Sequence, residues 1–254
     1  MTPPQISCVI PAYEAVDLVA ACLASIADQR GVDLEIILTD DSRSAAARAR
    51  LGDLCAAAPN ARYIAGARTG NPLENWNAGL AAARAPLVLM IHQDERLIDP
   101  HYLRRAVDLM RRPGVAAVRA GTQVTGVDRP SRFALASAMV GRLPGAARIL
   151  PAINWIGPTA AFVFRAGHRF DPSLVQLADV EFYGRVLKTG ALARLSGVQV
   201  ASLGHHGDQI TARIDPIALT RQELATLCAR RPPRYGRLER LACEAALRLR
   251  SQRR

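Results

Sequence analysis

Polar side chains that could do chemistry gather at three places in this sequence, each directly after an apolar run. The three segments are Pro11-Ala12-Tyr13-Glu14, Asp40-Asp41 and His92-Gln93-Asp94-Glu95. Carboxylates such as that of Asp94 are hard oxygen ligands, and one or two of them hold a divalent cation against a phosphate group. A cation held in this way neutralises the negative charge that develops on a departing phosphate. The residue types therefore indicate phosphate and metal chemistry.

The elements that must position these segments are short strands that alternate with helices. Strands are predicted over residues 6–10, 34–39, 62–65, 87–91, 115–120, 160–164 and 198–203, and helices over 14–29, 74–84, 99–112 and 179–188. The alternation is typical of βαβ units, a mostly parallel sheet and helices on both of its faces. Ligands of open α/β sheets bind outside the carboxyl ends of the strands, so the three polar segments are expected to converge on one pocket.

Each polar segment also has a purely structural explanation. Asp40 and Asp41 have the right chemistry to cap a helix that begins near Ser44. The third segment could be a solvated loop before a helix that starts with Asp99 as the N-cap acceptor and Pro100 as its first residue. Capping accounts less well for three polar segments at three strand ends, so a shared ligand site is the better hypothesis.

Several motifs occur in the order found in family 2 glycosyltransferases with the GT-A fold, which the chain resembles over about residues 5–212. The motifs are Val9-Ile10-Pro11-Ala12-Tyr13, Thr39-Asp40-Asp41-Ser42, Asn75-Trp76-Asn77-Ala78-Gly79-Leu80, His92-Gln93-Asp94-Glu95, Asn154-Trp155-Ile156-Gly157-Pro158-Thr159, Ala178-Asp179-Val180-Glu181-Phe182-Tyr183 and His206-Gly207-Asp208-Gln209-Ile210-Thr211. The resemblance implies an α/β, Rossmann-like fold. It also implies that a sugar moves, with inversion, from a nucleoside-diphosphate sugar to an acceptor hydroxyl.

The resemblance assigns the nucleotide and donor contacts to the first half of the chain. They are Pro11, Ala12, Tyr13, Glu14, Asp41, Arg68, Asn77, His92 and Gln93. Asp41 is implied as the contact to the base, and a UDP-sugar is the favoured donor. Asp94 and His206 are implied as the contacts to a divalent metal, Mg²⁺ or Mn²⁺. For His206 the alternative is an ordinary pair with His205 in a turn.

Four positions of these motifs depart from the family pattern. One is Ala178, which replaces the glutamate that precedes the family's catalytic aspartate. Glu14 stands where asparagine is common, and His92 replaces the first aspartate of the metal-binding motif. Glu95 stands where the fourth residue of that motif is usually aspartate. Asp94 is therefore the one carboxylate of the motif that is unchanged.

The catalytic and acceptor-side residues are implied for the second half. Asp179 matches the family's base, which takes the proton from the acceptor hydroxyl, and the dipole of a helix favours a carboxylate in its first turn. The acceptor side is assigned to Trp155, Gly157 and Glu181. The alternative is that Asp179 only caps its helix, while Glu181 forms a surface ion pair with Arg185 four residues on.

The chain is predicted to divide into a glycosyltransferase domain and a basic helical tail. Residues 1–212 form the domain, with a nucleotide-binding half over about 1–121 and an acceptor-binding half over about 122–212, and residues 213–254 form the tail. The tail contains two amphipathic helices, over 217–229 and 237–250. The second places an apolar set near one face, namely Leu238, Leu241, Ala245 and Leu249.

Two surroundings suit the tail helices. The first is expected to pack against the domain. A basic amphipathic helix can also lie on an anionic membrane surface, which would suit an enzyme with a lipid-linked acceptor. For the second helix, both packing and membrane contact stay open.

The amino-acid composition limits which partners and which cellular location are expected. The formal charge is +11, but Lys188 is the only lysine among 33 basic residues, which suggests a coding bias towards arginine. The chain shows no recognisable nucleic-acid-binding module, so no nucleic-acid partner is expected. Five cysteines without a CxxC pair, and no signal-peptide or membrane-spanning pattern, favour a cytoplasmic protein that is soluble or peripheral on the inner face of the cell membrane.

Three functions remain in order of preference. The first is a glycosyltransferase of polysaccharide or cell-surface glycan synthesis, acting on a glycan or lipid-linked acceptor. The second is a GT-A-like protein that binds sugars or partners without catalysis, which would explain the altered motif positions as decay. The third is a basic nucleic-acid-binding protein, motivated by charge alone.

Overall fold

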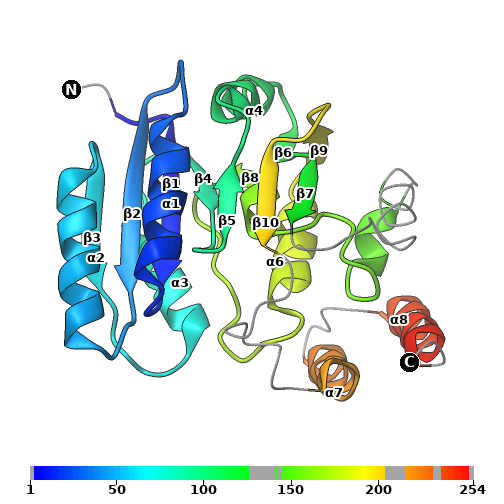
Figure 1. The fold of residues 1–254 in the computed structure, drawn as a ribbon. Helices are drawn as coiled ribbons and strands as arrows, with labels where there is room; N and C mark the ends of the chain where they lie inside the picture. Colours follow the sequence, from blue (N-terminus) through cyan, green and yellow to red (C-terminus); the bar gives the residue numbers. More distant parts are fainter. Residues whose placement is uncertain (1–2, 126–140, 142–144, 204–214, 231–235, 252–254) are drawn as a thin grey trace.

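A seven-stranded sheet forms the centre of the molecule (Figure 1). The computed structural model describes residues 3–125, 141, 145–203, 215–230 and 236–251. In sheet order the strands are β3 (Ala61–Ala65), β2 (Leu34–Asp40), β1 (Ile6–Ala12), β4 (Leu87–Met90), β8 (Phe162–Arg165), β6 (Val115–Arg119) and β9 (Ala191–Arg194). Strand β8 runs antiparallel to both neighbours, and the other four pairings are parallel. The predicted α/β class and mostly parallel sheet are confirmed.

Alternation along the strands builds two cores, one on each face of the sheet. Cys8 and Ile10 of β1 belong to the first core, which also contains apolar residues of α1 (Val16–Ala27), α2 (Ala45–Ala57) and α4 (Tyr102–Met110). Val9 belongs to the second core, with residues of α3 (Pro72–Ala82) and α6 (Ala178–Leu187). Because successive side chains of a strand point to opposite faces, one apolar run serves both cores. The prediction of helices on both faces is confirmed.

Helix α3 lies unusually close to the sheet. A Cβ atom added at Gly79 would stand 2.4 Å from Cγ1 of Val9 and 3.1 Å from Cγ2 of Thr39. Such distances are shorter than real contacts, so only glycine permits this approach. The close packing sets Asn75 of the same helix beneath the ends of β1 and β2.

A second, three-stranded sheet was not predicted. Its order is β5 (Glu95–Leu97), β10 (Val200–Leu203) and β7 (Thr122–Thr125), and β10 pairs antiparallel with β5 and parallel with β7. Of these strands only β10 was predicted, within residues 198–203; β5 and β7 are short and form no continuous apolar run. The same reason explains why β9 of the large sheet was missed. The prediction of a loop up to Glu95 is corrected, because strand β5 begins at that residue.

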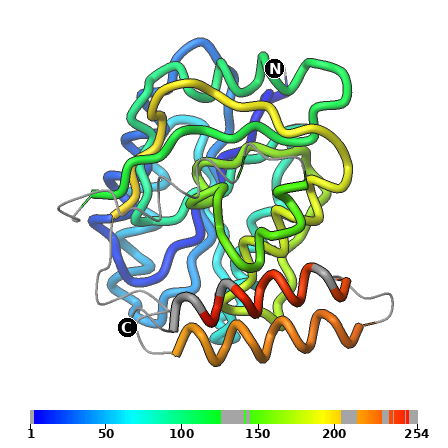
Figure 2. Tube along the Cα trace, turned by 90° about the vertical axis from the view of Figure 1, so that its right-hand side faces the viewer, coloured from blue at the N-terminus to red at the C-terminus, as the bar shows by residue number. Residues whose placement is uncertain are grey.

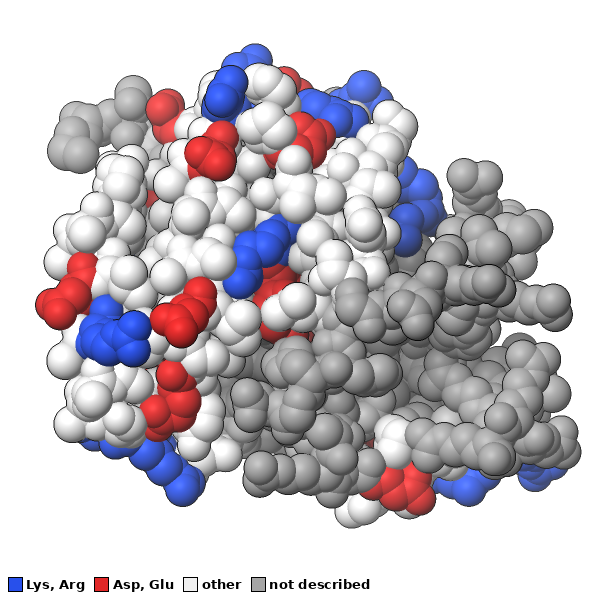
Figure 3. Space-filling view, in the orientation of Figure 1, with Lys and Arg blue, Asp and Glu red and all other residues white. Residues whose placement is uncertain are grey.

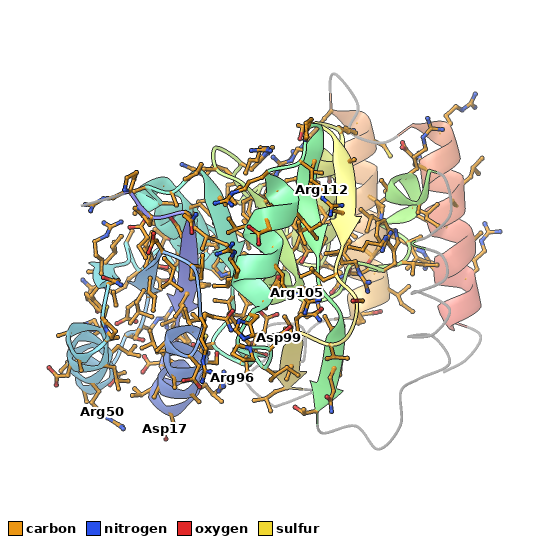
Figure 4. All side chains as sticks on the ribbon, turned by 90° about the horizontal axis from the view of Figure 1, so that it is seen from above. Asp17, Arg50, Arg96, Asp99, Arg105 and Arg112 are labelled. Atoms are coloured by element: carbon orange, nitrogen blue, oxygen red, sulfur yellow. The ribbon has the colours of Figure 1, made fainter. Side chains whose placement is uncertain are left out.

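The predicted start of the helix after β5 is also corrected. Helix α4 begins at Tyr102 with His101 as its N-cap residue. Asp99 instead closes the turn before the helix: its Oδ1 accepts from the amide of His101 at 2.9 Å. Its Oδ2 pairs with Arg105 at 2.7 Å (Figure 4).

The two tail helices, α7 (Pro216–Ala229) and α8 (Arg237–Ser251), lie side by side along one end of the molecule (Figure 2). Leu224 and Leu227 of α7 are buried in the second core, which confirms the predicted packing of the first tail helix. Cys243 of α8 is buried in the same core, Leu247 of α8 is buried as well, and Leu241 is 65% exposed. In the described part of the chain, no helix is long and apolar enough to cross a membrane.

Candidate functional site

The carboxyl ends of β1, β2 and β3 are tied together beneath the first two predicted segments. Asn75 of α3 donates from Nδ2 to the carbonyls of Ala12 at 3.4 Å and Thr39 at 3.2 Å. The amide of Asp41 donates to the carbonyl of Ala12 at 3.1 Å, and the amide of Gly66 donates to that of Asp40 at 2.7 Å. The first two predicted segments therefore meet at one place, together with the end of β3, which was not part of the prediction.

The two aspartates at the end of β2 make different contacts. Asp40 accepts from the amide of Ser42 at 2.8 Å and from the hydroxyl of Tyr63 at 2.7 Å. Asp41 is 8% exposed, and its Oδ1 accepts from the amide of Arg68 at 2.6 Å. Neither caps α2, because Ser44 is the N-cap residue and its own side chain accepts from the helix. The capping explanation for this pair is wrong.

The loop after β1 is fixed by side chains from the neighbouring loops. Tyr13 is 49% exposed, and its amide donates to Oε1 of Gln93 at 2.9 Å. Glu14 has a left-handed backbone with φ of 58°, and its Oε1 accepts from the amides of Arg43 at 2.7 Å and Ser44 at 2.8 Å. Asparagine tolerates this φ better than glutamate does, which explains physically the asparagine common at this position in the family.

Glu95 is a structural residue. It is 2% exposed, and its Oε2 accepts from the amide of His92 at 2.8 Å, the hydroxyl of Thr159 at 3.0 Å and the amide of Ala160 at 3.1 Å. Burial raises its pKa to about 7, against the opposing effects of His92 and of these hydrogen bonds. The carboxylate holds the loop 92–95 against the start of β8, so it is not available to a metal.

Asp179 and His92 lie close enough for the charge of one to affect the other. Oδ1 of Asp179 and Nε2 of His92 are both buried, and neither has a hydrogen-bond partner among the described residues. Burial raises the pKa of Asp179, and the nearby charge of His92 lowers it in part. The ring of His92 packs on Trp76 at 4.4 Å between centroids. Leu177, not Asp179, is the N-cap residue of α6, so the capping explanation for Asp179 is wrong as well.

Tyr183 forms the wall beside Asp179. Burial raises the pKa of this phenol well above its ordinary range, and the charges of Asp179 and Glu95 add to that effect. Its hydroxyl donates to the carbonyl of Gly157 at 3.3 Å. Gly157 has a φ of 106°, which favours glycine at this position. The site thus contains a buried carboxylate, with one oxygen that has no partner among the described residues, beside an aromatic residue and a glycine turn.

Two predicted site residues have other roles in the structure. Asn77 uses its amide for the main chain of Phe170, accepting at 2.8 Å and donating at 2.9 Å. Trp155 is 3% exposed, and its Nε1 donates to the carbonyl of Ala146 at 2.9 Å. Both act in packing, and this geometry argues against direct contact with donor or acceptor.

Glu181 lies on the side of α6 that faces away from Asp179. It is buried and pairs with Arg185 at 2.8 Å, so the predicted pair exists but is not on the surface. Both residues line a pocket of about 390 Å³ that Glu239 of α8 also borders. Contact between Glu181 and an acceptor at Asp179 is therefore not supported.

The predicted metal contacts are Asp94 and His206, and a metal ion there would also need ligands from the bound nucleotide or from water. Among the described residues, no cluster of three His, Cys, Asp or Glu side chains could hold a metal ion. His206 lies outside the described residues. Asp94 is half-buried directly before β5. Mg²⁺ and Mn²⁺ bound with a nucleotide need one or two carboxylates besides phosphates and water, so one aspartate fits such an ion.

The motif order and this geometry are matched by a known family. Residues 7–170 match the model of Glycosyl transferase family 2. The chain belongs to this family. The matched segment includes the ends of β1, β2 and β4, and it stops before Asp179 and the tail helices. The predicted family is therefore confirmed.

Two relatives have 29% identity to the chain. One is the uncharacterized protein MT1568 of Mycobacterium tuberculosis, aligned over 74% of this chain and 64% of its own length. The other is the succinoglycan biosynthesis protein ExoO of Rhizobium meliloti, aligned over 66% of this chain and 45% of its own length. The chain thus spans less than two thirds of either relative.

Solved structures share the fold. TarS 1-349 of S. aureus in complex with UDP-GlcNAc has a TM-score of 0.65 at 14% identity, covering 89% of this chain and 67% of that one. The mannosyltransferase PcManGT of Pyrobaculum calidifontis, in complex with GDP-Man and Mn²⁺, has a TM-score of 0.66 at 15% identity, covering 97% and 70%. At these identities the likeness concerns the fold, and it confirms the predicted GT-A architecture.

Sequence reasoning missed the bridging role of Asn75 and the part of Thr159 in holding Glu95. Asn75 stood in a quoted motif, and a polar residue on the buried face of a helix was the available signal. Thr159 gave no such signal, because its partner is 64 residues away. Long-range pairing of single side chains leaves no local pattern.

Proposed function

We propose that the chain is an inverting glycosyltransferase that uses a nucleoside-diphosphate sugar. The observation that carries the proposal is the buried Oδ1 of Asp179, which has no partner among the described residues and lies near His92. Leaving such a group unsatisfied costs stability, so its retention favours a function. Family membership supplies the class of reaction.

The donor nucleotide is proposed to lie over the ends of β1 and β2. The exposed ring of Tyr13 offers a stacking surface there, and Asp41 offers its carboxylate to the base beside the exposed Arg68. Pro11 and Ala12 are buried and shape the floor. Glu14 and Gln93 act through the loops they join, because their acceptor oxygens are already engaged. A UDP-sugar stays the favoured donor.

In the proposed reaction an acceptor hydroxyl attacks the anomeric carbon of the bound sugar. The bond from that carbon to the diphosphate breaks as the new glycosidic bond forms, and Asp179 takes the hydroxyl proton. Asp94 would hold a divalent metal together with the diphosphate, and His206 would be a further contact. When bound, the metal neutralises the charge of the leaving diphosphate. His92 lies close to Asp94 in the sequence and near Asp179, and in this proposal it orients the diphosphate of the donor.

A GT-A-like binding protein without catalysis is the second candidate, favoured by His92 and Glu95 in the metal motif. Glu95 is weak evidence for a loss of catalytic activity, because its carboxylate accepts three hydrogen bonds that hold the loop of the site in place. On the described part of the face in Figure 3, acidic and basic side chains are interspersed. That distribution gives no support to a nucleic-acid-binding surface on this face.

Thermal unfolding with nucleotides tests the proposal. UDP or GDP with Mn²⁺ at about 100 times its dissociation constant stabilises a protein by about 2.7 kcal/mol, so we expect a rise in Tm of about 5 °C or more. Asp94→Ala should abolish the contribution of Mn²⁺. Asp53→Ala, at an exposed position of α2, is the control and should keep it. No rise with any nucleotide or nucleotide sugar would refute the proposed function.

We also propose a glycan or lipid-linked acceptor and a place on the inner face of the cell membrane. ExoO, a relative, is named for succinoglycan biosynthesis, and the five cysteines here are free thiols, as in a reducing compartment. Leu241 is 65% exposed on α8, beside the exposed Arg237 and Arg240. A helix with an apolar residue among basic ones suits an anionic membrane surface.

Co-sedimentation with vesicles of phosphatidylglycerol and phosphatidylcholine tests the membrane contact. The chain should sediment with them at low salt, and Leu241→Glu should reduce the bound fraction severalfold. Ile98→Glu changes an equally apolar side chain, 48% exposed but outside the tail, and should have no effect. Equal binding by both variants would contradict a role for α8.

A further inference from the structure

A carboxylate from the tail binds the backbone just before α6. Glu223 of α7 is 5% exposed. Its Oε1 accepts from the amides of Val175 at 2.6 Å and Gln176 at 3.2 Å, and its Oε2 accepts from the amide of Leu177 at 2.8 Å. Three backbone donors therefore share one buried carboxylate, from a helix 46 or more residues away.

These amides stand at the N-terminus of the helix that carries Asp179. The N-cap residue of α6 is Leu177, whose side chain has no acceptor for the free N–H groups of the first turn. Glu223 supplies an acceptor from outside the helix to the segment that leads into it. Its negative charge also suits the positive end of the helix dipole. Hydrogen bonds to an ionised acceptor are stronger than neutral ones, so the segment is firmly held.

The same segment is held a second time by the end of α7. Arg230 forms an ion pair with Asp171, and its Nη2 donates to Oγ of Ser173 at 2.7 Å. Asp171, Ser173 and the three amides all lie in residues 171–177. Together, Glu223 and Arg230 fasten this segment from one helix, and we call the two residues the α7 clamp. The family match ends at residue 170, so the clamp lies outside it.

Asp179 lies in the first turn of α6, directly after the segment that the clamp holds. An aspartate in the first turn of a helix readily accepts from nearby backbone N–H groups, in competition with any other task. Here the amides leading into α6 are satisfied by Glu223, and Oδ1 of Asp179 has no hydrogen-bond partner among the described residues. Glu223 thus binds the backbone before α6, and Asp179 does not have to do so.

We infer that Glu223 is a positioning residue for the transfer reaction: it holds the N-terminus of α6 so that Asp179 faces the acceptor site. The inference rests on the proposed role of Asp179 as the base. It makes the first tail helix a working part of the active site through the backbone that Glu223 binds. Misplacing a base by about 1 Å can cost about 100-fold in rate.

The test compares Glu223→Gln with Leu227→Ala. Glutamine keeps the size of residue 223 but presents an N–H₂ group to the backbone donors. Leu227→Ala weakens the packing of the same helix, where Leu227 is fully buried, and leaves the clamp contacts in place. Hydrogen exchange by mass spectrometry follows the amides of residues 175–181, and hydrolysis and transfer of UDP-glucose or UDP-GlcNAc give kcat and KM.

For Glu223→Gln we expect exchange of residues 175–177 to accelerate at least 10-fold. We expect kcat to fall about 10- to 100-fold, with KM for the nucleotide sugar within about twofold. Leu227→Ala should lower Tm with kcat nearly unchanged. Equal losses of kcat in both variants, or faster exchange in Glu223→Gln with unchanged kcat, would overturn the inference.

The two proposals fail in different ways. If the unmodified chain turns over no nucleotide sugar, the proposed function fails and so does the catalytic meaning of the clamp. Exchange does not depend on turnover, and unchanged exchange in Glu223→Gln would overturn the clamp itself even in an active enzyme.

Discussion

At the scale of single residues, hydrogen-bond partners separate structural carboxylates from a candidate for catalysis. Asp40, Glu14 and Glu95 each accept two or three hydrogen bonds from the protein. Oδ1 of Asp179 accepts none from the described residues. All four follow strand ends or helix starts, where sequence patterns alone treat them alike. The partners, not the positions, tell them apart.

Asp179→Asn should therefore lower activity and raise stability together. Loss of a general base costs about 100- to 10,000-fold in kcat. Burial raises the pKa of Asp179, so its ionised form is disfavoured in the folded state and stability falls as pH rises through the window between the unfolded and folded pKa. The neutral asparagine removes that penalty at pH 7. Turnover of a nucleotide sugar and Tm at pH 7 measure the two effects.

Asp53→Asn is the matched control for this prediction. Asp53 is exposed on α2, so neither kcat nor Tm should change beyond small surface effects. An Asp179→Asn variant with unchanged kcat would refute the role of Asp179 as the base. A lower Tm would show instead that the carboxylate stabilises the fold.

At the scale of elements, the site depends on how closely α3 lies against the sheet. Gly79 allows that approach, and Asn75, one turn earlier, reaches the carbonyls at the ends of β1 and β2. Both residues sit in one helix, so the packing distance of α3 sets the geometry under the proposed nucleotide site. Helix α2 has no such constraint at Gly52, where an added Cβ atom meets nothing within 4 Å.

Alanine at these two glycines should have opposite effects. Gly79→Ala should destabilise the protein by about 1–3 kcal/mol, because overpacking forces α3 away from β1. Gly52→Ala should stabilise it by up to about 1 kcal/mol, because alanine is the better helix former. Urea unfolding of both variants measures the difference. Stabilisation by both changes would show that helix propensity, not packing distance, governs α3.

At the scale of the whole molecule, both tail helices contribute buried residues to the second core. Leu224 and Leu227 of α7 and Cys243 of α8 are buried with residues of α3 and α6. The ion pair between Arg230 and Asp171 adds a polar tie to the same end of the molecule. The tail helices therefore contribute to the stability of the domain that they cover.

Asp171→Asn should destabilise the protein in a pH-dependent way. The hydrogen bond to Arg230, with those of Ser173, outweighs burial and lowers the pKa of Asp171 to about 2. Its stabilisation is therefore complete above the unfolded pKa of about 4 and is lost as pH falls through about 2. We expect a loss of about 2 kcal/mol at pH 7 that narrows below pH 4, measured by urea unfolding across pH.

Asp17→Asn provides the control for this ion pair. Asp17 and Arg50 pair on the surface between α1 and α2 (Figure 4), with side chains 94% and 65% exposed. Exposed pairs of this kind contribute little, so no measurable change is expected. A similar loss in both variants would mean that the effect is one of general charge and not of the tie to the tail.

The sequence by itself determined the order of the main strands and helices, the α/β class and the family. Apolar periodicity is local, so it marked β1, β2 and β4 and the polar residues at their ends, including Asp41 and Asp94. The motif order then gave the expectation of an inverting transfer with Asp179 as base. Short polar strands such as β5 and β7 escaped, because three or four residues are too few to show a period.

Only the tertiary structure decided which polar atoms have hydrogen-bond partners within the protein and which remain available to a ligand. Glu95, Asn77 and Glu181 looked like site residues or motif departures, and each is engaged by partners brought near by folding. Glu223 received no role from the sequence, and its carboxylate binds the backbone of the segment before Asp179. A hydrogen bond forms between atoms about 3 Å apart, whatever their separation along the chain. Sequence spacing carries no record of such a contact.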